Sequence, residues 1–197
     1  ENGKSIKNEK GELVCINSFP SMPIFFWNDN NNKKYHDAYF NKYENVWCHG
    51  DYILKTENDG FIIFGRSDAT LNPGGVRIGT AEIYRQVEQI EEVMEGLVVG
   101  QIWKGDTRVV LFVRLNENSN LTEELIDQIK AKIRTGASPR HVPAKIISVK
   151  DIPRTKSGKI AELAVRDLIH NKPINNITAL ANPECLEEYK NIKELSV

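Results

Sequence analysis

The spacing of hydrophobic positions changes along the chain and predicts two kinds of structure. Up to Gly65 the apolar runs are short and separated by turn residues, which is typical of strands. Asn58-Asp59-Gly60 is a strong tight-turn signal, so residues 52–64 are predicted to form a hairpin beside a strand at residues 12–16. Four aromatic residues are expected to pack a core here: Phe19, Phe25, Phe26 and Trp27. This part is therefore expected to form a small antiparallel sheet.

From Thr80 onward, apolar residues recur at helical spacing and alternate with apolar strands. Ile83, Val87 and Ile90 share one face of a helix that Thr80 is expected to cap. Further elements are expected as helices from Thr122 and over residues 160–170, and as strands over residues 97–103, 108–115 and 144–149. This alternation predicts a small α/β domain with a three-stranded sheet. Residues 174–197 are expected to dock as an extension.

Composition supports a folded chain, and the two kinds of pattern place it in the α+β class. Hydrophobic residues make up 40% of the 197 residues, which is enough for a core. The 26 basic and 27 acidic residues nearly cancel to a net charge of -1, so no global field attracts nucleic acid or an anionic membrane. No apolar run approaches the ~20 residues of a membrane helix, and residues 1–4 open no signal peptide. We expect a cytoplasmic protein in which any anion site is local.

The cysteine and histidine patterns predict neither a metal site nor a histidine-based catalytic centre. Cys15, Cys48 and Cys185 are odd in number and widely spaced, so they indicate no disulfide framework and no zinc site. The four histidines are scattered, without the spacing of metal ligands or of a catalytic triad. Any chemistry must therefore depend on other residue types.

Residues 153–160 are the most unusual stretch for chemistry. Arg154, Lys156 and Lys159 place three cations within six residues, and the small residues between them would keep the backbone open. Because a helical pattern begins at Ile160, Lys159 is expected at a helix N-terminus, where unpaired N–H groups and partial positive charge favour a bound anion. One interpretation is a mobile loop that binds a phosphate or carboxylate. The other is a solvated basic turn.

This stretch is not a nucleotide-binding P-loop. Such a loop has a glycine five residues before its Gly-Lys pair and a Ser or Thr directly after it. Around Gly158-Lys159, the residues at those positions are Pro153 and Ile160. The lysine must therefore reach an anion in another way.

Two earlier stretches contain candidate ligand-binding residues. In residues 47–51 a glycine precedes Asp51, whose carboxylate can accept hydrogen bonds from two adjacent hydroxyls, as on a ribose. Asp is also a common turn residue, so a purely structural interpretation stays open. Residues 65–79 contain four glycines, one proline and two arginines, which allow a sharp bend and anion binding. The composition changes here, so the domain boundary is placed at Asp68.

Taken in order, residues 47–51, 65–82 and 153–160 resemble the end of the acyl-adenylate-forming superfamily, specifically the acyl-CoA synthetases. Each stretch is weak alone, but their order and spacing are specific together. Four stretches are similar to the members that use acetoacetate, a short keto acid: residues 19–23, 70–84, 139–143 and 180–184. The resemblance also implies a missing N-terminal domain with the ATP-phosphate loop and the acid pocket. The chain is therefore expected to be a C-terminal fragment, inactive alone.

The resemblance implies a domain arrangement and a reaction. Residues 1–67 would be the closing β part of the N-terminal AMP-binding domain, residues 68–175 a mobile lid, and residues 176–197 a C-terminal extension. In the implied reaction, an acid and ATP give acyl-AMP and diphosphate, and the CoA thiol then displaces AMP. ATP, CoA and Mg2+ are the implied cofactors, with the Mg2+ ligands mostly outside this chain.

The resemblance assigns four residues to the nucleotide and to the first half-reaction. Lys159 matches the lysine that contacts the acid oxygen and the α-phosphate. Asp51 matches the carboxylate that binds the ribose hydroxyls, and Arg66 the arginine that supports the nucleotide beside it. Arg77 is expected at a phosphate of the nucleotide or of CoA.

The second half-reaction is assigned to a hinge and a glycine loop. Rotation about Asp68 is expected to withdraw the catalytic lysine and to bring Gly74, Gly75 and Val76 to the CoA channel. Arg134 is assigned to a CoA phosphate. No metal ligand is assigned in this chain.

Two alternatives to a keto-acid ligase stay open at this point. A ligase for acetate or another short acid would differ in the acid pocket, which this chain lacks. A free-standing nucleotide-binding module would keep the fold and catalyse nothing alone. An open reading frame that continues upstream through a larger domain would favour a ligase.

Overall fold

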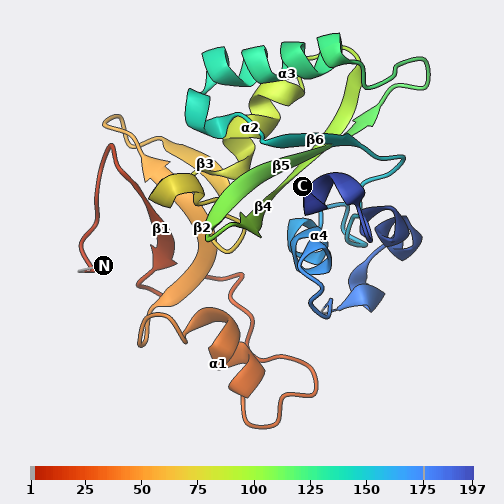
Figure 1. Ribbon diagram of the computed structural model, residues 1–197. Helices are drawn as coiled ribbons and strands as arrows, with labels where there is room; N and C mark the ends of the chain where they lie inside the picture. Colours follow the sequence, from red (N-terminus) through yellow and green to blue (C-terminus); the bar gives the residue numbers. More distant parts are fainter. Residues whose placement is uncertain (1–2, 175) are drawn as a thin grey trace. The chain divides into compact units, whose positions relative to one another are not determined.

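The computed structural model describes residues 3–174 and 176–197. The chain divides into two compact units, Glu1–Asp68 and Ala69–Val197. Each unit contains a three-stranded sheet together with helices (Figure 1). This mixed content confirms the predicted α+β class.

The first unit contains β1 (Lys10–Cys15), α1 (Lys33–Tyr39), β2 (Trp47–Lys55) and β3 (Phe61–Arg66). Its sheet has the order β1-β2-β3, and both strand pairs are antiparallel. β2 and β3 form the predicted hairpin, with a positive φ of 58° at Asp59 in the turn. A register shift between Tyr52 and Ile53 leaves Asp51 directly opposite Arg66. The two candidate residues are therefore neighbours across the strands.

An aromatic cluster forms the core beside this sheet. The Trp47 ring is buried and stacks on Tyr39 with ring centroids 3.6 Å apart, and Phe19 packs edge-on against Trp47 at 5.2 Å. By contrast, Phe25 and Trp27 are 61% and 91% exposed, so the prediction that they belong to a core is wrong. They lie in an irregular segment, where no strand or helix period directs a side chain inward.

The second unit contains α2 (Thr80–Val87), β4 (Val93–Trp103), β5 (Asp106–Leu115), α3 (Glu123–Gly136), β6 (Lys145–Ser148) and α4 (Glu162–Ile169). The three strands form one sheet in the order β4-β5-β6, which confirms the predicted three-stranded sheet. β4 and β5 are antiparallel, and Lys104 and Gly105 in their tight turn have positive φ values of 50° and 84°. β6 runs parallel to β5, because α3 carries the chain back across the sheet.

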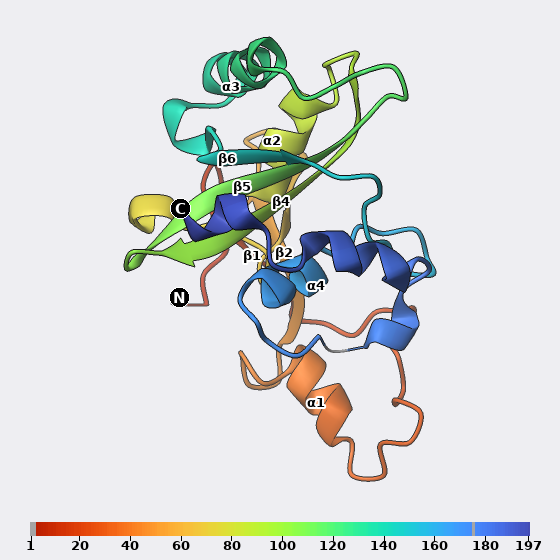
Figure 2. The same ribbon diagram turned by 45° about the vertical axis from the view of Figure 1, so that its right-hand side comes forward.

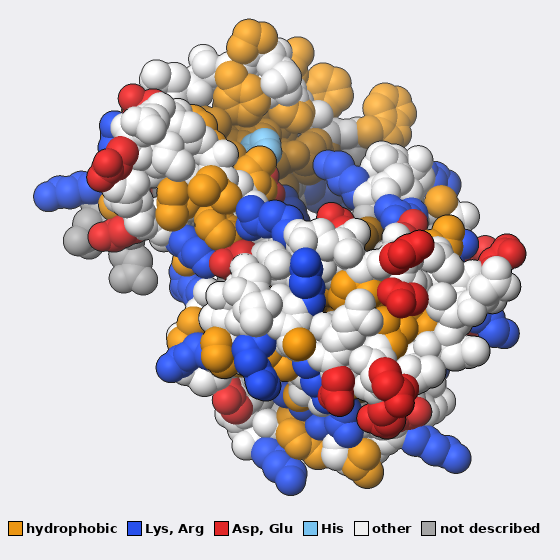
Figure 3. All heavy atoms as spheres, turned by 90° about the horizontal axis from the view of Figure 1, so that it is seen from above, with side chains coloured by type: hydrophobic (Ala, Val, Ile, Leu, Met, Phe, Trp, Pro, Cys, Tyr) orange, Lys and Arg blue, Asp and Glu red, His pale blue; other side chains and the backbone are white. Residues whose placement is uncertain are grey.

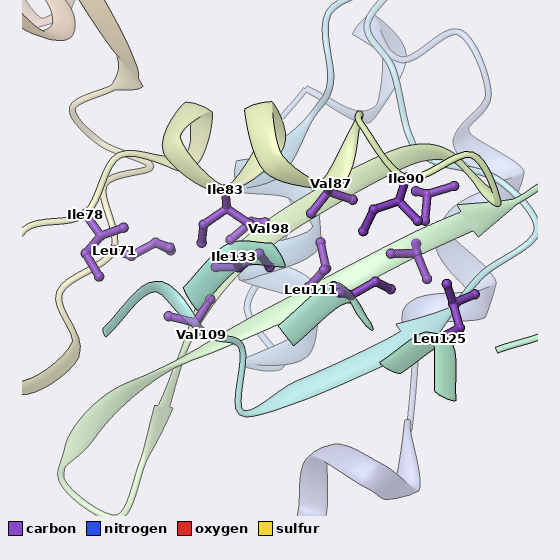
Figure 4. Close-up of a cluster of buried hydrophobic side chains, with 13 residues drawn as sticks. Leu71, Ile78, Ile83, Val87, Ile90, Val98, Val109, Leu111, Leu125 and Ile133 are labelled. Atoms are coloured by element: carbon purple, nitrogen blue, oxygen red, sulfur yellow. The ribbon is translucent and has the colours of Figure 1, made fainter. Parts of the chain in front are cut away.

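Each face of this sheet has its own hydrophobic core. Val98 and Leu111 face α2 and α3, where they pack with Ile83 and Ile133 (Figure 4). Neighbouring strand positions point to the opposite face and form the second core: Leu97, Val99, Val110 and Phe112. α2 and α3 therefore lie on one side of the sheet and α4 on the other (Figures 1 and 2).

Two of the helix starts can be compared with their predictions. The Thr122 side chain accepts a hydrogen bond from the backbone N–H of Leu125 at 3.3 Å and caps α3, which confirms the helix start predicted at Thr122. In α2 the cap is Gly79, and Thr80 is the first helical residue, only 3% exposed. The carboxylate of Glu82 accepts the Gly79 N–H at 2.9 Å. The prediction that Thr80 caps α2 is wrong because Glu82 satisfies the helix end.

The tail, residues 176–197, docks on the second core as predicted. It contains three short 3-10 helices: Ile177–Ala179, Pro183–Tyr189 and Lys193–Ser196. Its side chains Leu180, Leu186 and Tyr189 are buried, and the Tyr189 ring lies 4.8 Å from that of Phe112 in β5. The tail is therefore part of the hydrophobic layer that also contains α4.

Charged side chains are dispersed over the surface. On the face in Figure 3, Lys and Arg side chains lie among Asp and Glu, consistent with a net charge of -1. Along residues 3–174 and 176–197, no helix combines the length and apolar character needed to cross a membrane.

Candidate functional site

The end of the β2–β3 hairpin holds the predicted nucleotide residues of the first unit. The guanidinium of Arg66 donates to the carbonyl oxygen of His49 at 3.2 Å. It also forms two hydrogen bonds with the Asp68 carboxylate, from Nε to Oδ1 at 3.2 Å and from Nη2 to Oδ2 at 3.0 Å. This hydrogen bonding raises the pKa of Arg66, so the guanidinium keeps its charge. The structure thus brings Asp51, Arg66 and Asp68 to one edge.

Gly50 makes room for that guanidinium. Its φ is 82°, a conformation that side chains disfavour. A Cβ at this position would lie 2.8 Å from Nη2 and 2.9 Å from Nη1 of Arg66. The glycine before Asp51 therefore suits both the close approach of the arginine and the positive φ of the backbone within β2.

Asp51 keeps a carboxylate at this edge that is suited to hydroxyl groups. Its Oδ2 lies 3.4 Å from Nε2 of His49, and its side chain is partly exposed. A carboxylate has several lone-pair positions, so it can accept hydrogen bonds from two vicinal hydroxyls. The arrangement offers a hydroxyl-binding acceptor beside a permanent cation.

The glycine loop, residues 72–77, is held at its base by backbone hydrogen bonds. Leu71 and Ile78 are fully buried, and each donates its N–H to the carbonyl of the other at 2.9 Å. The N–H of Gly74 donates to both carboxylate oxygens of Asp106, at 3.1 and 3.0 Å. Residues 65–79 were expected to bend sharply, and the part between Leu71 and Ile78 is a closed loop held by β5.

The tip of this loop has free space around it. Gly74 and Gly75 have positive φ values of 56° and 77°, and an added Cβ would meet no atom within 4 Å at either position. Val76 is partly exposed and Arg77 is exposed. Glycine is therefore required here by backbone conformation, while the surroundings leave room for a ligand.

The loop that carries Lys159 differs from its prediction. Arg154 and Ile160 form a β-bridge, and Thr155 closes the turn by donating its N–H to the Lys159 carbonyl at 2.8 Å. The helix α4 begins at Glu162 after an Ala161 cap, so Lys159 lies outside the helix end. The predicted open backbone at a helix N-terminus is wrong, because local hydrogen bonds shape a compact hairpin instead.

These bonds change how Lys159 can act. Its backbone N–H donates to Oγ1 of Thr155 at 3.1 Å, so this group is already used within the hairpin. Its side chain is exposed, and its ammonium group forms no hydrogen bond or ion pair with any residue of the described ranges 3–174 and 176–197. The side chain, rather than the backbone, is therefore the group available to an anion.

The structure separates the lysine from the glycine loop. Leu71 and Ile78 belong to the core under α2 and α3, whereas Ile160, next to Lys159, packs against the core on the other face. Arg134 is exposed in the last turn of α3, on the same side as the glycine loop. The base of the glycine loop and the hairpin that carries Lys159 therefore lie on opposite sides of one sheet.

Sequence reasoning missed a partly buried polar contact between α2 and α4. The Tyr84 hydroxyl donates to Oε1 of Glu162 and accepts the N–H of Val98 at 3.1 Å. Burial, followed by the negative charge of Glu162, raises the pKa of Tyr84 well above its usual value, so the hydroxyl stays protonated. In the sequence Tyr84 is only the last residue of a motif, and no spacing pattern links it to Glu162 across 78 residues.

The fold and these sites define a class of protein. Residues 82–159 match the family described as AMP-binding enzyme C-terminal domain. A benzoate CoA ligase from Burkholderia xenovorans LB400 superposes on 82% of this chain and 31% of its own length, with a TM-score of 0.68 and 27% identity. The chain thus matches the AMP-binding enzyme C-terminal domain over residues 82–159 and is similar to the C-terminal part of acyl-CoA synthetases, which confirms the resemblance.

Within this class, acetoacetyl-CoA synthetases are similar over nearly the whole chain. The protein from Rhizobium meliloti (strain 1021) is 63% identical over 195 residues, covering 99% of this chain and 30% of its own length. The protein from Danio rerio is 46% identical, covering 98% and 29%. The structure of the Streptomyces lividans enzyme has a TM-score of 0.90 and 41% identity, covering 99% and 30%. The chain spans about a third of the length of these relatives.

Proposed function

We propose that this chain is the C-terminal part of an ATP-dependent ligase that joins acetoacetate to CoA, with release of AMP and diphosphate. The observation that carries the proposal is the exposed ammonium group of Lys159 on a fixed hairpin, in a chain 63% identical to an acetoacetyl-CoA synthetase. The preceding N-terminal part of the same protein would supply the acid pocket and the ATP-phosphate loop. This chain alone is expected to be inactive.

Adenylation is the step we assign to Lys159. A carboxylate oxygen of the acid attacks the α-phosphorus of ATP, the bond to the bridging oxygen breaks, and diphosphate leaves. Both reactants are negatively charged, so a cation placed between them lowers their repulsion and stabilises the charge that develops in the transition state. Loss of one such contact costs about 3 to 4 kcal/mol, or roughly 10²- to 10³-fold in rate.

The edge of the first unit would hold the nucleotide during this step. The Asp51 carboxylate is suited to the two ribose hydroxyls, and Arg66, fixed by Asp68, supports the nucleotide beside it. Arg77 is available to a phosphate of the nucleotide or of CoA because its side chain is exposed.

Thioester formation is the step we assign to the glycine loop. The CoA sulfur attacks the acyl carbon of acyl-AMP, AMP leaves, and the thiol proton is lost. Gly74, Gly75 and Val76 would line the channel for the pantetheine arm, and Arg134 would bind a CoA phosphate. The opposite placement of this loop and Lys159 on the sheet supports a lid that presents one side in each step, with Asp68 as its hinge.

The proposed domains follow from the assignment of the two half-reactions to different parts of the chain. Residues 1–67 would complete the N-terminal domain, residues 68–175 would be the lid and residues 176–197 its extension. Mg2+ is expected to enter with ATP, but the described residues contain no cluster of three or more His, Cys, Asp or Glu side chains that could hold a metal ion. No step is therefore assigned to a metal held by this chain.

The proposal is tested on the full-length protein by release of diphosphate with acetoacetate, acetate, propionate and butyrate. The expected result is the highest kcat/KM with acetoacetate. A preference for acetate would keep the ligase chemistry and change the acid. Absence of diphosphate release with every acid would contradict the ligase.

A further inference from the structure

The hairpin that carries Lys159 is paired with the tail on one side. The Lys156 N–H donates to the Ala179 carbonyl at 2.9 Å, and the Ala181 N–H donates to the Arg154 carbonyl at 2.8 Å. Between these two hydrogen bonds, Thr155 and Leu180 form an antiparallel β-bridge. The tail therefore acts as a neighbouring strand for the first half of the hairpin.

Asn182 adds side-chain bonds at the base of the same hairpin. Its Oδ1 accepts the backbone N–H of Arg154 at 2.9 Å. Its Nδ2 donates to Oδ2 of Asp151 at 2.5 Å and to the carbonyl of Ile152 at 3.0 Å. One carboxamide thus bonds to three residues, Asp151, Ile152 and Arg154, where the chain enters the hairpin, and both its donor and acceptor atoms are used.

Arg154 extends these contacts from Asn182 to the residue before the lysine. While its backbone N–H is held by Asn182, its Nη1 donates to the carbonyl of Gly158 at 2.8 Å. Its Nη2 lies 2.8 Å from Oε2 of Glu95 in β4. A continuous set of hydrogen bonds and an ion pair therefore joins the tail, the sheet and the tip of the hairpin.

We propose that Asn182 is a positioning residue for Lys159, so that the tail sets the lysine's geometry for adenylation. This inference rests on the proposed function of Lys159 and goes beyond it, because the matched AMP-binding enzyme C-terminal domain, residues 82–159, ends before the tail. A flexible lysine can act efficiently only if its backbone is fixed, and a displacement of about 1 Å at a reacting group can cost on the order of 10²-fold in rate.

A purely structural role for the tail makes a different prediction. The buried tail side chains Leu186 and Tyr189 stabilise the second unit as a whole, so their loss would affect every activity of the lid. Asn182 instead contacts the entry to one hairpin. Its loss should therefore impair the half-reaction that uses Lys159 and spare the other.

Gln101 provides a matched control. Like Asn182 it is a carboxamide that joins the tail to the rest of the second unit, since its Nε2 donates to the Leu195 carbonyl at 3.1 Å. Its other partner is Arg108, and both are remote in the chain from the Lys159 hairpin. Gln101→Ala thus removes an amide anchor of the tail without removing a hydrogen bond of the hairpin.

The experiment compares Asn182→Ala, Gln101→Ala and Lys159→Ala in the full-length protein. Diphosphate release measures adenylation, and transfer from supplied acetoacetyl-AMP to CoA measures the second half-reaction. Amide hydrogen exchange over residues 151–160 reports the hairpin. For Asn182→Ala we expect faster exchange at Arg154, adenylation lower by roughly 10- to 100-fold and transfer within about twofold of wild type. Gln101→Ala should leave the ratio of the two half-reactions unchanged.

Equal losses in both half-reactions for Asn182→Ala, or no loss in either, would overturn the positioning role. So would unchanged exchange at Arg154. In each of these cases a selective loss with Lys159→Ala would leave the proposed ligase mechanism intact. If Lys159→Ala itself were not selective, the proposed role of the lysine would fail, and the positioning role with it.

Discussion

The backbone of Gly50 and the guanidinium of Arg66 lie so close that a Cβ on residue 50 would be 2.8 Å from Nη2. The arginine is held there by the His49 carbonyl and by the Asp68 carboxylate. Because the far end of an arginine can move more easily than a backbone, any side chain at residue 50 would displace the guanidinium. The contact therefore links a backbone position to the proposed nucleotide site.

Gly50→Ala is expected to raise the KM for ATP by about tenfold, since charge-assisted hydrogen bonds of Arg66 would be lost. Gly105→Ala is the control, because Gly105 has a similar φ of 84° and no atom lies within 4 Å of the point that its Cβ would occupy. Both variants should lose about 1 kcal/mol of stability through backbone strain. Steady-state kinetics of the full-length variants measures the KM for ATP, and thermal unfolding measures the loss of stability. An equal KM for both variants would be inconsistent with the contact between residue 50 and Arg66.

Gly75→Leu is expected to block thioester formation and to spare acyl-AMP formation. The added side chain meets no neighbour within 4 Å of its Cβ, so the fold should tolerate it apart from the strain of a φ of 77°. In the proposed channel, however, the leucine would occupy the path of the pantetheine arm. The two half-reactions measured separately serve as internal controls. Loss of diphosphate release in this variant would contradict the assigned channel.

The alkylation rate of Cys185 reports whether the tail is docked. Burial, with the nearby charge of Asp151, raises the pKa of this thiol from 9.0 to about 11. Alkylation at pH 8 should therefore be slower at Cys185 than at the less buried Cys15, and should accelerate as the pH approaches 11. Peptide mass spectrometry after timed iodoacetamide treatment measures both rates. Equal rates at pH 8 would show that the tail does not protect the thiol.

The same pKa shift predicts how stability depends on pH. The unfolded thiol ionises near pH 9.0, while the folded thiol resists ionisation up to about 11. The contribution of Cys185 to stability is therefore fully present below pH 9 and is lost as the pH rises toward 11. The unfolding temperatures of wild type and Cys185→Ala should therefore approach each other as the pH rises from 9.0 to about 11.

Much of the fold followed from local patterns. The tight turn at Asp59 and the alternation of helices and strands after Thr80 predicted both sheets, because period and turn chemistry are local properties. The predictions failed where contacts outside the local pattern determine the position of a side chain or the end of a helix. Trp27 is exposed despite its size, and Glu82 rather than Thr80 completes the start of α2.

The candidate sites were predicted only in part, for a similar reason. Motif order predicted roles for Asp51, Arg66 and Lys159, and the structure shows Asp51 opposite Arg66 in the β2–β3 ladder. The sequence could not place Lys159 in a hydrogen-bonded hairpin, since the bonds that shape it are partly made by the tail. Asn182 lies in residues 180–184, one of the stretches that carry the resemblance, but the stretch assigned it no role, because its contacts span about 30 residues.

The most direct test of the account is the full-length Lys159→Ala variant assayed in the two half-reactions, with Lys156→Ala as the control. Lys156 is an exposed lysine of the same hairpin, so it matches the change in charge. We predict that Lys159→Ala lowers diphosphate release by about 10²- to 10³-fold and leaves transfer from acetoacetyl-AMP to CoA nearly unchanged, while Lys156→Ala affects neither strongly. Full diphosphate release without the Lys159 amine, or an equal loss in both half-reactions, would contradict the account.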